Sequence, residues 1–483
     1  MASQASATSS AFWATTPKRL TDLEDFTSTQ LPYILTAFLF LLILYSLQGP
    51  KSNLPFLNPR RTFEFSNVRP KKEFIVGANE MIGKWFNQNP DKPTRVTTDA
   101  GVMTLLPPKF ADEIKNNGVL DFEGFAHKAY HSQFPGFEGF RDSSLVHRVI
   151  EKDISKFLNT STKILSEEFD EAMPIYFPES KVYATDIFAA IFQLRICPAS
   201  LRFLFQWFLL ACYTARSHVK EARSIINPMV ERRRKERADL KARGKPIVEH
   251  QDAIDWLEKY CNGEKYDATE SLLILAIATT ATTMDLLCQT MIHLAKNSEI
   301  LEPLREETRA CIKEERWTKV SLYNMKLLDS VIKESQRLKP LFTAAMVRVA
   351  MQEVRLSDGT LIRKGDMVGV TSRRIWDPTL HKNPTQWDGY RFLRMRQQPG
   401  RDNANQLVSM NHNHLGFGCG MHACPGRFLA DNEIKIALLH ILFKYDWRLP
   451  EGAKTEPVCF GFNINIDPGL QVEIRRRGEG VPV

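Results

Sequence analysis

One cysteine loop near the carboxy-terminal end constrains the fold of this chain more than any other stretch. It reads Phe417-Gly-Cys-Gly-Met-His-Ala-Cys-Pro-Gly-Arg427, and Gly416 precedes it. Its glycines let the backbone bulge and come close to a ligand. Pro425 suits the first turn of a helix, and apolar residues with helical spacing follow it. The pattern predicts that Cys424 lies at a helix start, where backbone N–H groups and the helix dipole favour the thiolate.

Three kinds of ligand are candidates for such a loop. Cys419 and Cys424 could bind zinc with His412, His414 and His422, although their spacing differs from that of the usual structural sites. A phosphate loop would need a following Lys-Ser/Thr and would open a βαβ unit, and this loop lies near the end of the chain instead. A haem iron would hold the cysteine as thiolate, which favours O–O cleavage. The eight cysteines are otherwise spread thinly, which fits a reducing compartment.

The loop resembles the haem-binding signature of the cytochrome P450 superfamily, Phe-x-x-Gly-x-Arg-x-Cys-x-Gly. It matches at Phe417, Gly420, Cys424 and Gly426, and His422 stands in the usual arginine position. Histidine there is familiar in filamentous-fungal members, including those similar to ent-kaurene oxidase. The resemblance implies haem b as cofactor, with Cys424 as axial ligand to its iron. It also implies that His422 donates a hydrogen bond to a haem propionate, with a charge that depends on pH.

The resemblance also predicts a Glu-x-x-Arg pair upstream of the loop, and Glu334 and Arg337 supply it. Residues three apart lie on one helix face and can pair. Arg391, in Trp387-Asp-Gly-Tyr-Arg-Phe392, is the expected third partner. The implied cluster is largely buried and braces the haem face, so that removing one member strands a charge. Arg348 falls where the family places another propionate-binding arginine, and a plain surface arginine is the alternative.

The helix containing Ala278-Thr-Thr-Ala-Thr-Thr283 resembles the oxygen-activating helix of the family. Thr282 aligns with the threonine that hydrogen-bonds bound dioxygen and passes protons to it. The alternative is an ordinary helical threonine bonded to the i−4 carbonyl. Ala281 replaces the acid of many relatives, and Asp285 lies a turn further on. Apolar segments expected over the substrate are Phe122–Phe137, Leu275–Thr279 and Leu341–Met346.

The apolar run Leu31–Leu47 carries no charge and predicts a transmembrane anchor. As a helix it spans about 25 Å, close to the thickness of an endoplasmic-reticulum bilayer, about 27 Å. A signal peptide and a buried core helix are the alternatives, but a long polar stretch precedes the run and no cleavage-like site follows it. Basic residues are denser after it than before it, which places the larger part in the cytosol. The expected location is the endoplasmic-reticulum membrane, with a single pass.

The predicted fold class is mainly α with small β-sheets, a cytochrome P450 fold preceded by one transmembrane helix. Helical periodicity is clear over several segments, and Asp358-Gly359 marks a β-hairpin. The predicted helices are Ile150–Phe169, Ser217–Lys241, Ala268–Lys296, Lys326–Leu338 and Asp431–Tyr445. The predicted organisation is a polar segment (1–30), the anchor (31–47), a proline-containing linker (48–70) and a haem-thiolate monooxygenase domain (71–483).

The resemblance breaks near residues 194–198, where Leu194 runs almost directly into Pro198 and a new apolar segment. Relatives carry roughly forty more residues there, which form helices beside the haem and over the substrate. A splice variant, a gene-model error or a true deletion would each give this join. Losing part of a helical core would cost several times the usual margin of stability.

The resulting hypothesis is a monooxygenase that hydroxylates or epoxidises a hydrophobic natural-product precursor of the terpenoid or alkaloid class. Electrons from NADPH would arrive through NADPH-cytochrome reductase, with cytochrome b5 as an optional second partner, and the net charge of +8 suits an acidic reductase. A haem-binding but inactive protein, and an isomerase or peroxide-driven enzyme, are the alternatives. No basic stripe with stacking aromatics suggests nucleic acid. The run Glu231–Arg237 is predicted to be a solvated helix end.

Overall fold

The computed structural model describes residues 30–47, 53–64, 66–141, 144–172, 191, 193–197, 201–247, 249–261, 263 and 266–477. The chain divides into two compact units, Met1–Asn53 and Leu54–Val483. The predicted polar segment up to residue 29, the start of the linker (48–52) and Pro198 of the join lie outside the described residues.

In the first unit, helix α2 (Leu31–Leu47) has the bounds of the predicted anchor and is apolar throughout. Among the residues that the structure describes, the helix long and apolar enough to cross a membrane is α12 (Ala268–Lys296) of the second unit, which packs against other helices of the fold, whereas α2 counts as a shorter apolar helix. The uncharged sequence of α2 is compatible with a membrane anchor.

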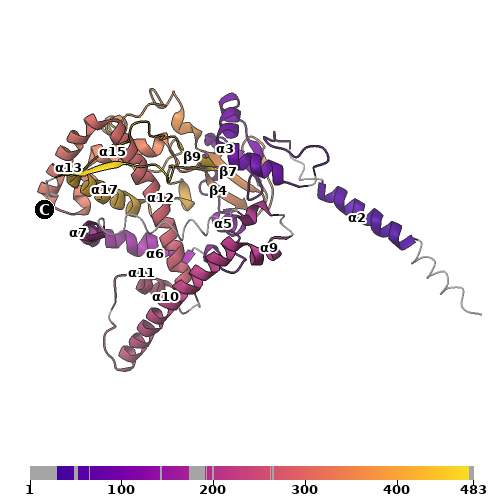
Figure 1. Cartoon of the computed structure of the whole chain (residues 1–483), viewed down its shortest axis with the longest axis horizontal. Helices are drawn as coiled ribbons and strands as arrows, with labels where there is room; N and C mark the ends of the chain where they lie inside the picture. Colours follow the sequence, from indigo (N-terminus) through magenta and orange to yellow (C-terminus); the bar gives the residue numbers. More distant parts are fainter. Residues whose placement is uncertain are drawn as a thin grey trace, which may run out of the picture. The chain divides into compact units, whose positions relative to one another are not determined.

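The second unit is mainly helical (Figure 1). Its longest helices are α10 (Leu210–Ala242), α12 and α3 (Val68–Gln88). The other α-helices are α4 (Ala111–Ile114), α5 (Phe122–Tyr130), α6 (Ser144–Val149), α7 (Ser155–Ala172), α9 (Arg202–Phe208), α11 (Ala253–Tyr260), α13 (Leu301–Glu315), α14 (Lys319–Asn324), α15 (Lys326–Leu338), α16 (Arg391–Arg396) and α17 (Arg427–Lys444). The predicted helices are confirmed, with Ala268–Lys296 and Lys326–Leu338 matched at both ends.

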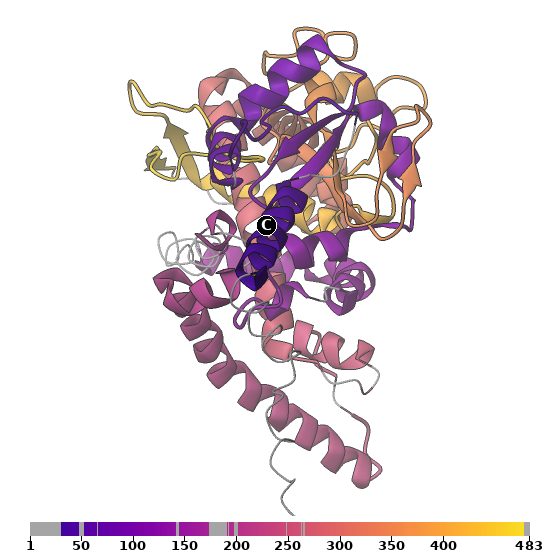
Figure 2. The same ribbon diagram turned by 90° about the vertical axis from the view of Figure 1, so that its right-hand side faces the viewer.

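The strands are short and form small sheets, as predicted. The largest sheet has the order β1-β2-β7-β4-β3, with β2 and β7 parallel and the other neighbours antiparallel. It joins strands far apart in the sequence, as the purple and orange arrows in Figure 2 show. Its strands are β1 (Thr94–Thr97), β2 (Val102–Leu106), β3 (Leu120–Asp121), β4 (Ala344–Ala350) and β7 (Met367–Thr371). The two-stranded sheets pair β5 (Val354–Arg355) with β6 (Leu361–Ile362), the predicted hairpin, β8 (Tyr445–Arg448) with β11 (Glu473–Arg476), and β9 (Val458–Phe460) with β10 (Asn463–Asn465).

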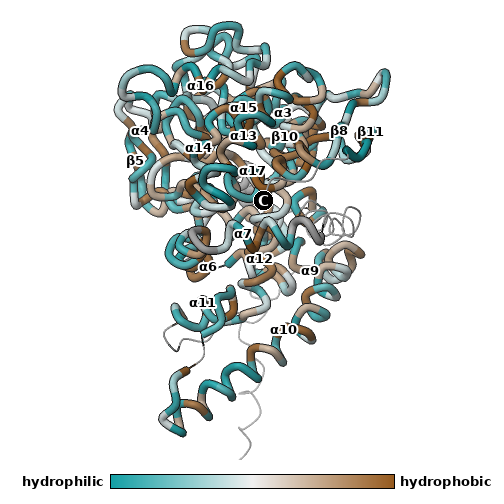
Figure 3. The backbone as a smooth tube through the Cα atoms, turned by 90° about the vertical axis from the view of Figure 1, so that its left-hand side faces the viewer, coloured by the Kyte–Doolittle hydropathy of each residue, from teal (hydrophilic) through white to brown (hydrophobic). Residues whose placement is uncertain are grey.

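The main hydrophobic core lies where α12, α13, α15 and α17 meet. Buried aliphatic side chains such as Leu294, Leu328 and Leu438 fill it. Helix α17 is buried along most of its length, and in Figure 3 its brown, hydrophobic trace lies in the interior. Each fully buried aliphatic side chain of this kind contributes about 1.5–3 kcal/mol. This core fixes α17, and with it the start of the helix that follows Cys424.

The basic run in α10 has partners that the sequence did not reveal. Arg233 pairs with Asp252 at 2.7 Å, and Arg234 pairs with Glu258 at 2.6 Å. Both acids belong to α11 or the residue that caps it. The run is a helix end, as predicted, and α11 neutralises part of its charge.

The helix just after the join is apolar and exposed. In α9, Phe203 is 63%, Trp207 is 57% and Phe208 is 76% exposed. The middle of α12 is also exposed, including Thr282 and Met284. Single exposed apolar residues are normal, but contiguous patches of this kind mark surfaces that something covers.

Candidate active site

The cysteine loop is seated against two distant elements. Met421 N–H donates to Lys115 O at 3.1 Å, just beyond α4, and Gly418 N–H donates to Leu415 O at 2.9 Å within the loop. A Cβ on Gly420, which has φ +78°, would lie 2.3 Å from Lys115 O. A Cβ on Gly416 would lie 2.2 Å from Gln336 Oε1 of α15. Gly420 is therefore required both by the close approach of the Lys115 backbone and by its own left-handed backbone, whereas a side chain at Gly416 would have to displace the Gln336 side chain.

Cys424 lies three residues before α17, which begins at Arg427 rather than at Pro425. Its N–H donates to Phe417 O at 2.8 Å, which closes the loop. Burial raises the pKa of its thiol, and hydrogen bonds from the backbone N–H groups of Gly426 and Arg427 oppose that rise. The backbone donors predicted at the helix start are present. Their lowering of the thiol pKa is smaller than the rise caused by burial. A thiolate here therefore requires a cation bound at the sulfur.

A bulge in β4 shapes the region of Arg348. The register of β4 against β7 shifts between Ala345 and Arg348, and Met346 has a left-handed backbone with φ 53°. Bulges of this kind re-aim side chains, and a non-glycine residue with positive φ is uncommon. Arg348 is buried, so the alternative of a surface arginine is wrong.

The buried guanidinium of Arg348 lacks an anion. Its Nη1 donates to Val347 O, whereas its Nη2 is buried and has no hydrogen-bond partner among the described residues. Burial lowers its pKa to about 10, with only Asp121 opposing the shift. His422 lies near enough that burial and Arg348 together lower the imidazole pKa. A buried charge needs a partner, so an anionic group such as a haem propionate fits between these two side chains.

The three charged residues predicted to form a cluster come together. The carboxylate of Glu334 accepts from Arg337 Nε and Nη2, both at 2.8 Å, and from Arg391 Nε at 3.1 Å. Arg337 also donates to Ile375 O and Pro384 O, and the side chains of Glu334 and Arg337 are fully buried. The cluster thus ties α15 to α16 and to the loop between them.

Thr282 makes the ordinary helical bond. Its hydroxyl donates to Ala278 O at 3.0 Å, the i−4 carbonyl. Asp285 accepts from Lys339 Nζ and, at 3.0 Å, from Ile466 N–H. Its carboxylate is therefore engaged on the side of α12 that faces α15 and β10, which disfavours it as a proton donor to Thr282.

A second buried charge cluster, around Asp329, was not predicted from the sequence. Asp329 of α15 accepts from Arg396 Nη1 at 2.9 Å, Lys435 Nζ at 3.0 Å and Leu407 N–H at 3.0 Å. It connects α15, α16, α17 and the chain leading to the cysteine loop. The sequence around Asp329, Arg396 and Lys435 shows no pattern that distinguishes these buried charges from charged residues on the surface of a helix.

Glu433, nine residues after Cys424, provides a test of burial in α17. Burial raises the pKa of its carboxyl to about 7, so the folded protein binds a proton that the unfolded chain releases above about 4.5. Stability therefore falls as pH rises from about 4.5 to 7 and stays lower above that range. We expect Glu433→Gln to raise the free energy of unfolding at pH 8 by about 1–3 kcal/mol and to leave it nearly unchanged at pH 5. Thermal unfolding at both values measures this, with the exposed Glu306→Gln as control, and an equal effect at the two pH values would contradict the burial argument.

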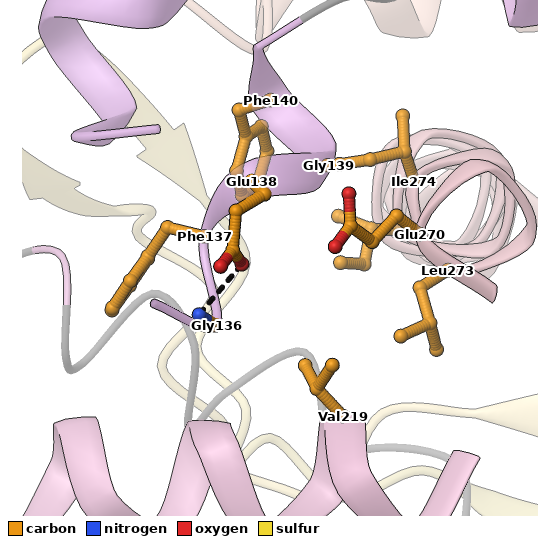
Figure 4. A pocket seen from close by; sticks show the side chains of 10 residues that line it. Gly136, Phe137, Glu138, Gly139, Phe140, Val219, Glu270, Leu273 and Ile274 are labelled. Atoms are coloured by element: carbon orange, nitrogen blue, oxygen red, sulfur yellow. Dashed lines mark hydrogen bonds between the residues drawn. The ribbon is translucent and has the colours of Figure 1, made fainter. Parts of the chain in front are cut away.

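A recess beside α12 joins two of the segments predicted to line the substrate site. A small cavity of about 20 Å³ lies between residues 136–140, Val219 and the α12 residues Glu270, Leu273, Ile274 and Ile277. The carboxylates of Glu138 and Glu270 lie on opposite sides of it (Figure 4). Burial, together with Asp267 and Glu138, raises the pKa of Glu270 to about 7, while Arg223 and Arg141 oppose that rise. The recess is more polar than the sequence suggested, and Leu341–Met346 does not line it.

The histidines near the loop have other roles than zinc binding. His412 pairs with Asp112 at 2.7 Å, and His414 hydrogen-bonds Gln336 at 2.8 Å. In the part of the chain that the structure describes, no group of three or more His, Cys, Asp or Glu side chains could hold a metal ion. The geometry gives the zinc alternative no support.

Comparison with known proteins identifies the class. The family model for Cytochrome P450 matches residues 155–469. Cytochrome P450 monooxygenase hepE of Aspergillus oryzae is 38% identical over 495 aligned residues, covering 93% of this chain and 90% of the relative. Cytochrome P450 monooxygenase TRI1 of Fusarium sporotrichioides is 36% identical and covers 95% and 92%. Dihydromonacolin L monooxygenase LovA of Aspergillus terreus is 33% identical and covers 92% and 93%.

The fold agrees with these matches. The solved structure of retinoic acid-bound cyanobacterial CYP120A1 superposes with a TM-score of 0.58 at 17% identity, covering 84% of this chain and 96% of that one. The protein is thus an oxidoreductase of the monooxygenase class. The chain belongs to the cytochrome P450 family, and the predicted likeness to fungal members is confirmed. The family and fold imply a haem cofactor.

Proposed function

We propose that this chain is a haem-thiolate monooxygenase that hydroxylates or epoxidises a hydrophobic natural-product precursor of the terpenoid or alkaloid class. The observation that carries the proposal is the partly buried Cys424 at the end of a loop whose backbone N–H groups face the sulfur. Haem b bound there would supply oxygen activation. Cys424 would hold the iron through its sulfur, and Phe417, Gly420 and Gly426 would shape the loop around it.

The other residues would hold and protect this centre. Arg348 and His422 would bind the propionates, which supplies the anion that the buried guanidinium lacks. Glu334, Arg337 and Arg391 would brace the helix and loop behind the haem. Thr282 would deliver a proton from its Oγ1, after giving up its bond to Ala278 O.

Electrons would come from NADPH through NADPH-cytochrome reductase, with cytochrome b5 as a second donor. The net charge of +8 supports docking of an acidic flavoprotein. Helix α2 would anchor the protein in the endoplasmic-reticulum membrane by a single pass, with the catalytic domain in the cytosol, as the basic residues after it favour.

Reductase dependence tests this assignment. We expect microsomes containing the full-length chain, a reductase and NADPH to convert a member of a terpenoid and alkaloid panel into a product that carries one added oxygen atom. Mass spectrometry under ¹⁸O₂ measures it, and microsomes with Cys424→Ala serve as control. Turnover with peroxide alone, or an isomerised product without added oxygen, would assign the chain to the peroxide-driven or isomerase alternative instead.

A second function has an observation of its own. The match to hepE spans 495 aligned positions, whereas 93% of this 483-residue chain is only about 450 residues, so roughly 45 positions have no counterpart here. The exposed apolar side chains of α9 support a missing layer at the join. On this alternative the chain is a haem-binding but catalytically impaired variant. Insertion of the corresponding relative's segment after Leu194 would then restore turnover that the present chain lacks.

A further inference from the structure

A second, larger cavity lies away from the cysteine loop, beside the carboxy-terminal half of α12. Its volume is about 310 Å³, which is within the range of small-molecule sites. Side chains from α3, α12, the end of α15 and the segments around β9 and β10 line it. The residues that matter here are Gln289, Ile292, His293, Lys296, Trp376 and Ile464.

The cavity has a buried floor and an exposed rim. Gln289 is 6%, Ile292 is 4% and Ile464 is 3% exposed, whereas Lys296 and Pro457 are exposed. A ligand can therefore place an apolar body against the floor and keep a charged group at the rim.

The charge at the rim is positive. None of the residues that line the cavity is acidic, and two are lysines. Lys339 is paired with Asp285. Lys296 Nζ donates to the neutral hydroxyl of Thr455 at 2.5 Å, and no ion pair is made to it among the residues that the structure describes. An anionic group at the rim would accept a charge-assisted hydrogen bond from Lys296 Nζ.

The wall is mixed, with polar groups from Asn79, Gln289, His293 and Thr455, but one part of it offers a rigid apolar surface. Trp376 Nε1 donates to Leu338 O at 3.3 Å, which fixes the indole, and Leu338, Pro457 and Ile464 also line the cavity. From the apolar part of the wall, a lysine at the rim and the absence of lining carboxylates, we propose that this cavity binds a small amphiphilic carboxylate, with its ring or chain on the floor and its carboxylate at Lys296. The site is separate from the proposed haem site and does not depend on the proposed function.

The floor connects to the charge cluster around Glu334. Gln289 hydrogen-bonds His293 at 2.9 Å, His293 hydrogen-bonds Ser335 at 3.0 Å, and Ser335 accepts from Trp387 Nε1 at 3.3 Å. The next residue, Asp388, donates its N–H to Glu334 at 3.1 Å. Ligand binding at the floor therefore stabilises elements that hold the cluster, and the melting temperature rises with ligand concentration.

The test uses naphthalene-2-carboxylate as probe and the full-length protein, with an azole on the haem iron to block the active site. Equilibrium dialysis measures the affinity. We expect Lys296→Glu and Lys296→Met to weaken binding at least tenfold, and thermal unfolding without ligand checks that both variants are folded. Lys313→Glu, an exposed lysine on α13, should leave the affinity unchanged. The neutral naphthalene-2-carboxamide should bind the unaltered protein at least tenfold more weakly than the carboxylate.

Three results would overturn the proposal. They are no saturable binding of the carboxylate, equal affinity in the Lys296 variants and the parent protein, and equal affinity for carboxylate and carboxamide. The comparison of carboxylate with carboxamide uses the unaltered protein. It therefore tests the proposal even if the Lys296 variants do not fold.

Discussion

Replacing Cys424 by alanine should abolish the absorbance band at about 450 nm of the reduced, CO-bound protein, because that band reports a thiolate ligand to haem iron. It should also abolish reductase-dependent oxygenation. No other described cysteine lies at a loop with backbone donors from two consecutive residues at a helix start. The spectrum is recorded per mole of folded protein, as judged by circular dichroism.

The matched control lies five residues away in the same loop. Cys419 is 6% exposed, and burial raises the pKa of its thiol, but it packs into a hydrophobic cluster with Leu415. Cys419→Ala should keep the band, with at most a modest loss of stability. Loss of the band in Cys419→Ala and its retention in Cys424→Ala would reverse the ligand assignment.

Replacing Arg337 by leucine should have the second-largest effect, on folding itself. The change leaves the Glu334 carboxylate fully buried with only Arg391 as ionic partner and removes the donors to Ile375 O and Pro384 O. Breaking a buried pair from one side costs about 3–5 kcal/mol. Total stabilities are about 5–15 kcal/mol, so a large loss of folded, haem-containing protein is expected. Denaturant unfolding and haem content per chain measure it.

An exposed ion pair provides the control. Arg448 is 79% exposed and bonds Glu473 on the surface. Arg448→Met should change the free energy of unfolding by less than about 1 kcal/mol. Arg337→Lys keeps the charge but loses the planar guanidinium that bonds two carboxylate oxygens. Its loss in free energy of unfolding should lie between the losses of Arg337→Leu and Arg448→Met. Equal stability of Arg337→Leu and Arg448→Met would refute a structural role for the cluster.

The sequence predicted those parts of the fold and site that short-range patterns encode. Helical periodicity predicted α12 and α15 at their observed bounds, because their apolar faces repeat at the helical period. Turn chemistry at Asp358-Gly359 predicted the hairpin of β5 and β6. The spacing of Glu334, Arg337 and Arg391 to the cysteine loop predicted the buried cluster, because the resemblance supplied the long-range pairing that no local pattern contains.

The features that were missed depend on tertiary contact. The bulge at Met346 arises from the pairing of β4 with β7, and no glycine in the sequence indicates it. Asp329 becomes a buried hub only when α16 and α17 pack on α15. For Thr282 the sequence left two alternatives open, because the choice depends on a side-chain rotamer, and the structure shows the hydrogen bond to Ala278 O.

The carbon-monoxide difference spectrum of the dithionite-reduced, full-length protein in microsomes tests the central claim most directly. A band at about 450 nm is predicted, because it requires both haem bound through the Cys424 thiolate and a folded chain despite the short join at residues 194–198. A band at about 420 nm, or no bound haem, would contradict the account and would favour the impaired variant.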